Sequence, residues 1–295
     1  NDAPRFRVAG LIAKPDADRV GETLVELQRF LTLRGVAIVP EVTAAMLLTG
    51  SAENGVPLEE LGRQVDFAVV VGGDGTLLGA ARALAPFDIP LLGVNLGRLG
   101  FLADISPAQL VTRLDEVLDG RCTEERRFLL TASVIRRGER IFEQSAVNDV
   151  VVHRTNATSM VEMVTHVDGV FLNSQRSDGL IVSTPTGSTA YALSVGGPIL
   201  SPSLKALVLA PINPHALTMR PIVVDSESVI GISFRAGRNF GAQVICDSVT
   251  SPDLEVEDRI EIRQSGRSFR LLHPEDYDFF EILRAKLNWS TGHSV

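Results

Sequence analysis

Two apolar patterns alternate along the first 120 residues. Short apolar runs predict strands at residues 6–12, 36–39, 67–71 and 89–94. Apolar residues at helical spacing predict helices at 20–34, 58–64, 76–84 and 107–119. Strands and helices in alternation are typical of a parallel sheet with helices on both faces. We therefore expect an α/β domain here, with ligands bound beyond the carboxyl ends of its strands.

A different pattern begins at Phe128, after the polar stretch 121–127. Short β-rich runs are separated by turns, and Arg137-Gly138 and Asp168-Gly169 mark two of those turns. Further apolar runs predict strands at 228–234, 242–246 and 259–262. This spacing predicts an all-β domain of the antiparallel sandwich type.

Residues 275–287 have the apolar spacing of a last helix, and their pattern differs from that of the strands before them. We expect this helix to pack back on the first domain. The sequence thus predicts an α/β domain at 1–127, a β-rich domain at 128–272 and a C-terminal helix within 273–295.

Composition and charge narrow the class of protein. With 295 residues, 45% of them hydrophobic and 22% charged, the chain has the composition of a soluble globular protein of one large or two ordinary domains. Its net charge of -8 argues against binding to nucleic acid, which requires a basic face. We find no export signal, no long uncharged apolar run and no paired cysteines, so we expect no membrane segment and a location in the reducing cytoplasm. The five histidines lack ligand spacing, so we expect no His-based metal site.

The segment 67–84 contains the most informative turn. Its strand, 67–71, lacks polar alternation, as expected when both faces of a strand are covered. Gly72, Gly73 and Gly75 follow, which allows the backbone to take positive φ and to approach a ligand closely. Asp74 is the only functional group in the turn, and Thr76 is expected to cap the next helix.

Such a turn directs backbone N–H groups and a helix N-terminus into one concavity, which suits a phosphate. A carboxylate among phosphates fits phosphoryl transfer to an alcohol, in which Asp74 accepts the hydroxyl proton or binds a cation. The alternative is a tight turn whose aspartate caps the following helix. This segment alone does not decide between the two interpretations.

Two polar segments stand out in the second half. Between Arg176 and Ser194, hydroxyl and small side chains held by glycine turns suit a site that binds ribose hydroxyls and an amide. An exposed hairpin rich in Ser and Thr is the alternative, although the apolar residues 180–182 and Tyr191 favour the site. The pair Asn148-Asp149 lies inside an apolar run, where it could bind a purine edge or a ribose diol, or form a bulge.

Together these motifs resemble the NAD kinase family, in particular its bacterial ATP-NAD kinases. In the family's order they are GGDG at 72–75, LGRLGFLAD at 96–104, Asn148-Asp149, DGLIVSTPTGSTAY at 178–191 and GGPI at 196–199. GGDG also occurs in diacylglycerol, sphingosine and 6-phosphofructo-kinases, whereas STPTGSTAY separates the NAD kinases from them. A lipid or sugar kinase and a non-catalytic dinucleotide-binding regulator are therefore the alternative hypotheses.

The resemblance implies transfer of a phosphoryl group from ATP, or polyphosphate in some members, to the 2′-hydroxyl of the adenosine ribose of NAD. It also implies a divalent metal ion such as Mg²⁺ and a homodimer or homotetramer. Asp74 would be the general base, and no residue is assigned as a metal ligand. The nucleotides would be bound by Gly72, Gly73, Asp74, Gly75, Phe101, Asn148, Asp149, Arg176, Asp178, Thr186, Thr189, Ala190, Tyr191 and Ser194. Asp149, Asn213 and Val249 depart from the pattern common in the family.

Overall fold

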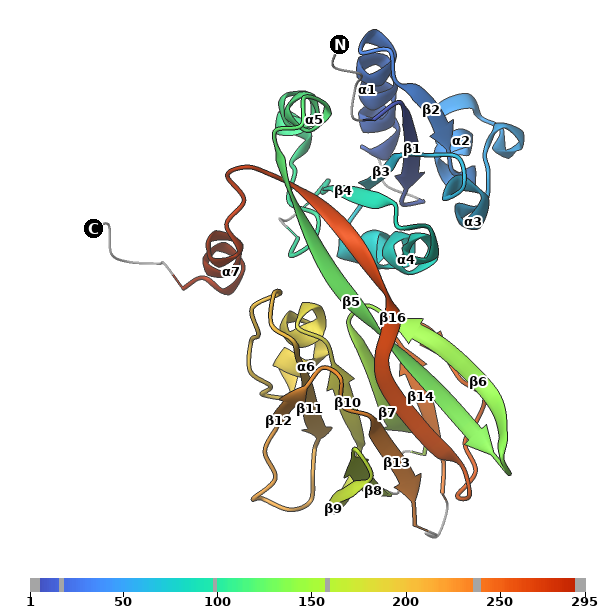
Figure 1. The fold of residues 1–295 in the computed structure, drawn as a ribbon, viewed down its shortest axis with the longest axis vertical. Helices are drawn as coiled ribbons and strands as arrows, with labels where there is room; N and C mark the ends of the chain where they lie inside the picture. Colours follow the sequence, from blue (N-terminus) through green and yellow to red (C-terminus); the bar gives the residue numbers. More distant parts are fainter. Residues whose placement is uncertain (1–5, 16–18, 98–99, 157–159, 236–239, 290–295) are drawn as a thin grey trace. The chain divides into compact units, whose positions relative to one another are not determined.

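The structure is a computed structural model, and it describes residues 6–15, 19–97, 100–156, 160–235 and 240–289 (Figure 1). The chain divides into two compact units, one made of residues 1–126 and 269–295 and the other of residues 127–268. Strands β5 (Cys122–Arg136) and β16 (Arg259–Pro274) each run from one unit into the other. No described helix is long and apolar enough to cross a bilayer.

A parallel sheet forms the centre of the first unit, as the sequence predicts. Its strands are β1 (Val8–Ala13), β2 (Ala37–Pro40), β3 (Phe67–Val71) and β4 (Pro90–Val94), in the order β2-β1-β3-β4. All three neighbouring pairs are parallel. Since β3 and β4 run in the same direction, the glycine-rich turns that follow them lie at one edge of the sheet, at the strands' carboxyl ends.

The helices of this unit follow the predicted order with one addition. They are α1 (Val20–Leu33), α2 (Val42–Thr49), α3 (Leu58–Leu61), α4 (Asp74–Leu84), the short 3-10 helix η3 (Pro107–Gln109) with α5 (Leu110–Leu118), and α7 (Phe279–Leu287). The sequence pattern missed α2 because its apolar residues have no helical periodicity; the Glu41 carboxylate caps its start and Gly50, with φ of 74°, ends it. Helix α7 begins later than expected, where the Asp278 carboxylate accepts a hydrogen bond from the N–H of Phe280.

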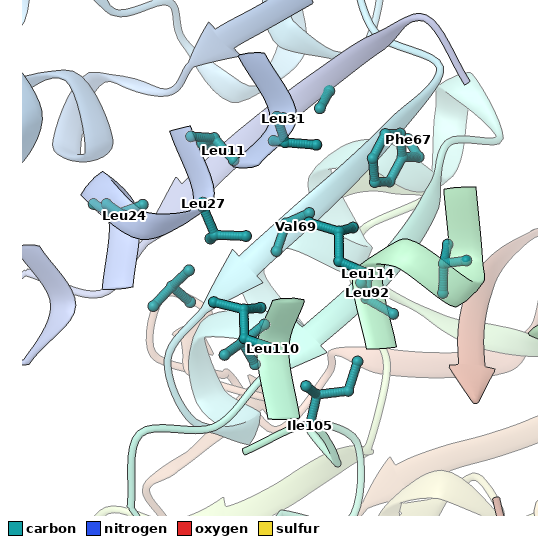
Figure 2. Packing of buried hydrophobic residues seen from close by; sticks show 14 of the residues in the cluster. Leu11, Leu24, Leu27, Leu31, Phe67, Val69, Leu92, Ile105, Leu110 and Leu114 are labelled. Atoms are coloured by element: carbon teal, nitrogen blue, oxygen red, sulfur yellow. The ribbon is translucent and has the colours of Figure 1, made fainter. Parts of the chain in front are cut away.

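The buried core of the first unit lies between α1, α5 and the sheet. Leu24, Leu27 and Leu31 of α1 are fully buried in one cluster with residues of β1, β3 and α5. Figure 2 shows these leucines in the same cluster as Phe67 of β3 and Leu114 of α5. The 3.6-residue spacing seen in the sequence thus corresponds to the face that packs on the strands.

The second unit contains antiparallel strands from two sheets, the first of which continues through β16 into the parallel sheet of the first unit. One includes β5, β6 (Glu139–Ala146), β8 (Val161–Val167), β9 (Val170–Ser177), β13 (Ile230–Phe234) and β16. The other has the order β12-β11-β10-β7-β14-β15, with bounds Ile222–Asp225, Ala206–Ile212, Gly179–Ser183, Asp149–Arg154, Ala242–Cys246 and Val249–Thr250. Both sheets contribute residues to one buried apolar cluster, which confirms the predicted sandwich.

The turns at 137–138 and 168–169 are hairpin turns, and both residues of each have positive φ. The polar stretch 121–127, by contrast, is not an irregular break. Residues 122–127 begin β5, in which Thr123, Glu124 and Arg126 are exposed whereas Arg127 is buried.

Candidate functional site

The glycine turn after β3 begins a helix directly. The N–H of Gly72 donates to the carbonyl of Val94 over 2.9 Å, Gly73 is the N-cap residue of α4, and Asp74 is its first residue. Two expectations are wrong in detail. Gly72, Gly73 and Gly75 do not adopt positive φ, and Thr76 lies within the first turn of α4 instead of capping it.

Lack of space for a side chain explains why glycine is needed at only one of these three positions. A Cβ atom at Gly72 would lie 2.6 Å from the Thr76 hydroxyl, so a side chain is excluded there. At Gly73 and Gly75 an added Cβ would meet no atom within 4 Å. Neither φ nor packing therefore requires glycine at these two positions. Because glycine has no side chain, space is left open beside the N-terminus of α4, a helix of eleven residues.

The Asp74 side chain is half-buried and bonded to the second glycine turn. Its Oδ2 accepts the N–H of Phe101 over 2.9 Å, and its Oδ1 accepts the N–H groups of Leu102 and Ala103 over 3.1 and 3.2 Å. A Cβ at Gly100 would come within 2.2 Å of Oδ1, so this approach requires glycine. The two turns that the sequence placed at one edge are thus joined through Asp74.

Sequence reasoning missed Lys14, which lies one residue beyond β1. Its N–H donates to the carbonyl of Val71 over 3.0 Å, which places Lys14 beside Gly72. The strand order reverses between β1 and β3, and ligands of open α/β sheets bind at such a reversal. The side chain is exposed and makes no ion pair with the described residues. A cation at the end of the first predicted strand was the signal available in the sequence.

In the second unit, Asn148-Asp149 lies against the STPTG segment. Strands β7 and β10 pair Asp149 with Ser183. The Thr184 hydroxyl donates to the carbonyls of Val147 and Asn148 over 2.7 and 3.1 Å. Gly187 is needed here, because a Cβ would lie 2.2 Å from the carbonyl oxygen of Asn148. The two polar segments expected to form one site are therefore adjacent.

Asp149 is a buried carboxyl group, with 6% of its surface exposed. Burial raises its pKa to about 7, and the nearby negative charge of Asp247 adds to the effect. Asp247 itself accepts the N–H groups of Val147 and Asn148, both over 2.9 Å. The sequence analysis did not single out Asp247, yet its carboxylate fixes the backbone that carries the Asn148-Asp149 pair.

Asp178 is held by two neighbours that the sequence analysis did not assign to the site. Its Oδ1 lies 2.6 Å from Nε of Arg154, and its Oδ2 accepts the amide N–H of Asn213 over 3.0 Å. Asn213 has φ of 44°, a conformation that asparagine tolerates better than most residues. This explains why asparagine suits the position that departs from the family pattern.

The remaining expected residues differ in exposure. Thr186 is buried, Phe101, Thr189 and Ala190 are half-buried, and Arg176, Tyr191 and Ser194 are exposed. Phe101 belongs to the first unit, where the Lys286 ammonium lies 5.2 Å from its ring centroid. The described structure therefore forms two clusters, one around Asp74 in the first unit and one around Asn148-Asp149 in the second.

An α/β unit whose glycine turn opens at a helix start, continued by a β sandwich with a buried polar cluster, is compatible with a two-domain phosphotransferase. The family model of the ATP-NAD kinase N-terminal domain matches residues 9–122, and that of the C-terminal domain matches residues 147–274. The chain belongs to the ATP-NAD kinase family. Family membership makes it a kinase that phosphorylates NAD.

Relatives and solved structures agree with this assignment. An NAD kinase of Methylococcus capsulatus is 59% identical over 286 residues, covering 97% of this chain and 98% of its own. One from Cellvibrio japonicus is 48% identical over 293 residues, covering 98% and 97%. Yeast NADH kinase complexed with NADH has a TM-score of 0.88 at 25% identity, covering 99% and 90% of the two chains. An Archaeoglobus fulgidus NAD kinase in complex with ATP has a TM-score of 0.74 at 27% identity, covering 94% and 99%.

Proposed function

We propose that the protein transfers the terminal phosphoryl group of ATP to the 2′-hydroxyl of the adenosine ribose of NAD, giving NADP. The observation that carries this proposal is the open space at Gly73 and Gly75, beside a helix N-terminus and the single carboxylate of Asp74. Backbone N–H groups at such a position bind phosphate oxygens. One relative is solved with ATP, the proposed donor, and another with NADH, the reduced form of the proposed acceptor.

In this proposal each unit has its own task. The turn formed by Gly72, Gly73 and Gly75 binds the donor phosphates, with Phe101 lining the site from the second glycine turn. The second unit binds NAD through Asn148 and Asp149 at the adenine or ribose edge. The dinucleotide pocket is completed by Arg176, Asp178, Thr186, Thr189, Ala190, Tyr191 and Ser194. We assign these tasks to an α/β domain at 1–127 and a β-rich domain at 128–272, with the C-terminal helix within 273–295.

Asp74 acts as the general base. An alcohol has a high pKa, so the carboxylate needs only to accept the proton while the new P–O bond forms. Three backbone N–H groups hold Asp74 in place, and its Oδ2 accepts one of them, which leaves a lone pair on that oxygen for the hydroxyl proton. Most of the rate enhancement then comes from alignment of the reactants and from stabilisation of charge on the phosphoryl oxygens.

The positive charge required by the phosphates comes from two sources. Lys14 supplies an ammonium group beside the turn. Within the described ranges, no group of three or more His, Cys, Asp or Glu side chains could hold a metal ion. We propose that a Mg²⁺ ion enters with ATP as part of the substrate, since Mg²⁺ binds readily through substrate phosphates and few protein carboxylates.

We further propose that the enzyme works in the cytoplasm as a homodimer or homotetramer, with ATP as its donor. A coupled assay of NADP formation tests the reaction directly. The purified protein is given ATP or polyphosphate with NAD or NADH, and separately radiolabelled ATP with diacylglycerol or fructose 6-phosphate. We expect label in NADP with ATP and NAD. Label in the lipid or sugar, or turnover of no acceptor, would contradict the proposal.

A further inference from the structure

Three polar side chains of β8 and β9 carry buried atoms that form no hydrogen bond with the described residues. Thr165 of β8 and Gln175 of β9 are 1% and 5% exposed, and Asn173 of β9 is paired in register with Thr165. The Thr165 hydroxyl, the Asn173 amide oxygen and both polar atoms of the Gln175 amide make no hydrogen bond. Burying such groups unpaired costs free energy, and native proteins rarely leave them so. Their presence therefore indicates that something else satisfies them.

These side chains line a cavity of about 250 Å³. Its opposite wall is apolar and comes from the second sheet, with Leu180 of β10 and Leu209 of β11, and Ile222 of β12 beside them. Arg220 also lines the cavity and is exposed. Its Nη1 donates to the carbonyls of Leu217 and Met219, both over 2.7 Å, which fixes the guanidinium. The cavity thus combines amide and hydroxyl groups, an apolar wall and one cation.

We propose that this cavity is a binding site for a small flat molecule that carries a primary amide. A primary amide both donates and accepts, so it matches the Gln175 amide through two hydrogen bonds and leaves atoms for Thr165 and Asn173. A cavity of about 150 Å³ is enough for one aromatic ring, so 250 Å³ holds a ring with an amide group. The apolar wall accommodates the ring face.

Water is the competing occupant. At roughly 30 Å³ per molecule the cavity would hold about eight waters. Water would satisfy the amide and the hydroxyl, but it gains nothing from Leu180, Leu209 and Ile222, which an aromatic ring covers. None of the residues that line the cavity belongs to the proposed nucleotide sites, so the inference does not depend on the kinase reaction.

Benzamide is the probe for this site. We expect ligand-observed NMR with the full-length protein to give a Kd of roughly 1 mM, the affinity typical of so small a ligand. Gln175→Met keeps the side-chain volume and removes the amide, so it should weaken benzamide binding at least tenfold. Gln243→Met is the matched control, because Gln243 lies on β14 and its amide already donates to Asp253 over 2.9 Å. This variant should bind benzamide as the wild type does.

Thr165→Val is a second variant, should Gln175→Met fail to fold; it removes the hydroxyl and should weaken binding severalfold. Because NAD itself carries a carboxamide, the titration is repeated with NAD at saturation, and benzamide should stay bound. A water-filled cavity would leave benzamide unbound to the wild type, which would overturn the proposal. Equal binding to Gln175→Met, or displacement by NAD, would overturn it as well. The benzamide results do not depend on whether the protein forms NADP, so this proposal and the proposed function can fail independently.

Discussion

At the scale of single residues, the site is determined by contacts that leave little freedom. Asp74 accepts three backbone N–H groups, and Gly100 permits that approach because no Cβ would fit. Gly73 and Gly75 stand in open space. The Asp74 carboxylate is therefore held in place by protein contacts, while the space beside the start of α4 is open. This is expected of a side chain that is preorganised to bind a ligand.

Asp74→Asn should reduce kcat roughly 10²–10⁴-fold, because the amide cannot accept the hydroxyl proton. NAD binding, measured by calorimetry, should remain nearly intact. The amide nitrogen will face at least one of the three N–H donors, so we also expect a loss of stability of about 1 kcal/mol in urea unfolding. A variant with wild-type kcat would exclude the role of general base.

Gly75→Ala separates folding from ligand binding. The added methyl group meets no protein atom and lies in the first turn of α4, so stability should rise by up to about 1 kcal/mol. If the donor phosphates lie at this turn, the methyl group obstructs them and the KM for ATP should rise at least tenfold. Gly79→Ala on the same helix, also in open space, is the matched control and should stabilise without changing the KM. Equal kinetics in the two variants would place the phosphates elsewhere.

Asp149 should make stability depend on pH. Its carboxyl group titrates near 3.8 when unfolded and with a pKa of about 7 when folded. Between these pH values the folded protein binds more protons than the unfolded chain, so stability falls as pH rises, by roughly 4 kcal/mol at most. Asp149→Asn lacks this titration. Urea titrations at pH 5 and pH 8 give the free energy of unfolding of the variant and of the wild type. The variant should be more stable relative to the wild type at pH 8 than at pH 5. A constant difference would show that Asp149 is ionised throughout.

At the scale of elements, an ion pair between half-buried Arg136 and buried Asp258 holds the hairpin end of β5. The Arg136 guanidinium donates to both oxygens of Asp258, each over 2.8 Å, and Asp258 is fully buried. Burial by itself would raise the pKa of Asp258. The hydrogen bonds from Arg136 and from the N–H of Glu255 outweigh burial and lower the pKa below its ordinary value. The pair therefore fixes β5 to the loop that leads into β16.

Arg136→Ala should destabilise the protein by about 3–5 kcal/mol, because it leaves a buried carboxylate without its partner. This contribution is present above the ordinary pKa of an aspartate and is lost as pH falls through the lowered pKa of Asp258. Arg140→Ala, on the same hairpin, removes an exposed pair with Glu143 and should cost less than about 1 kcal/mol. Chemical unfolding at pH 7 compares them, and similar losses would show that the burial of Asp258 has no energetic effect.

At the scale of the whole molecule, the chain combines two units of different architecture, each matched by its own family model. The turn around Asp74 belongs to one and the cluster around Asn148-Asp149 to the other. The units are continuous through β5 and β16. If each unit binds its own nucleotide, each nucleotide should slow amide hydrogen exchange mainly in the unit that binds it.

Hydrogen exchange followed by mass spectrometry tests that division. Bound ATP should slow amide exchange at 73–75, since the backbone N–H groups at this helix start would contact its phosphates. Bound NAD should slow exchange at 147–150 and 183–190. A control without nucleotide gives the baseline. Protection by NAD confined to the first unit would contradict the assignment of the NAD site to the sandwich.

Much of this arrangement could be predicted because it is local in the sequence. The continuous apolar run of β3 and the helical spacing of α1 predicted their elements, since periodicity follows directly from the geometry of each element. Helix α2, without periodicity, was missed. The sequence did not predict a strand at 122–127, because a stretch exposed to solvent has no apolar run to reveal it.

By itself, the sequence determined the alternation of strands and helices, the hairpin turns and the residue types of the site, because each depends on neighbours a few positions away. Only the tertiary structure decided which groups meet. It directs Asp74 to N–H groups 27 to 29 residues further along the chain, places Lys14 beside the glycine turn and brings Asp247 to the backbone of Asn148. Such contacts depend on strand order and packing, which no short sequence pattern encodes.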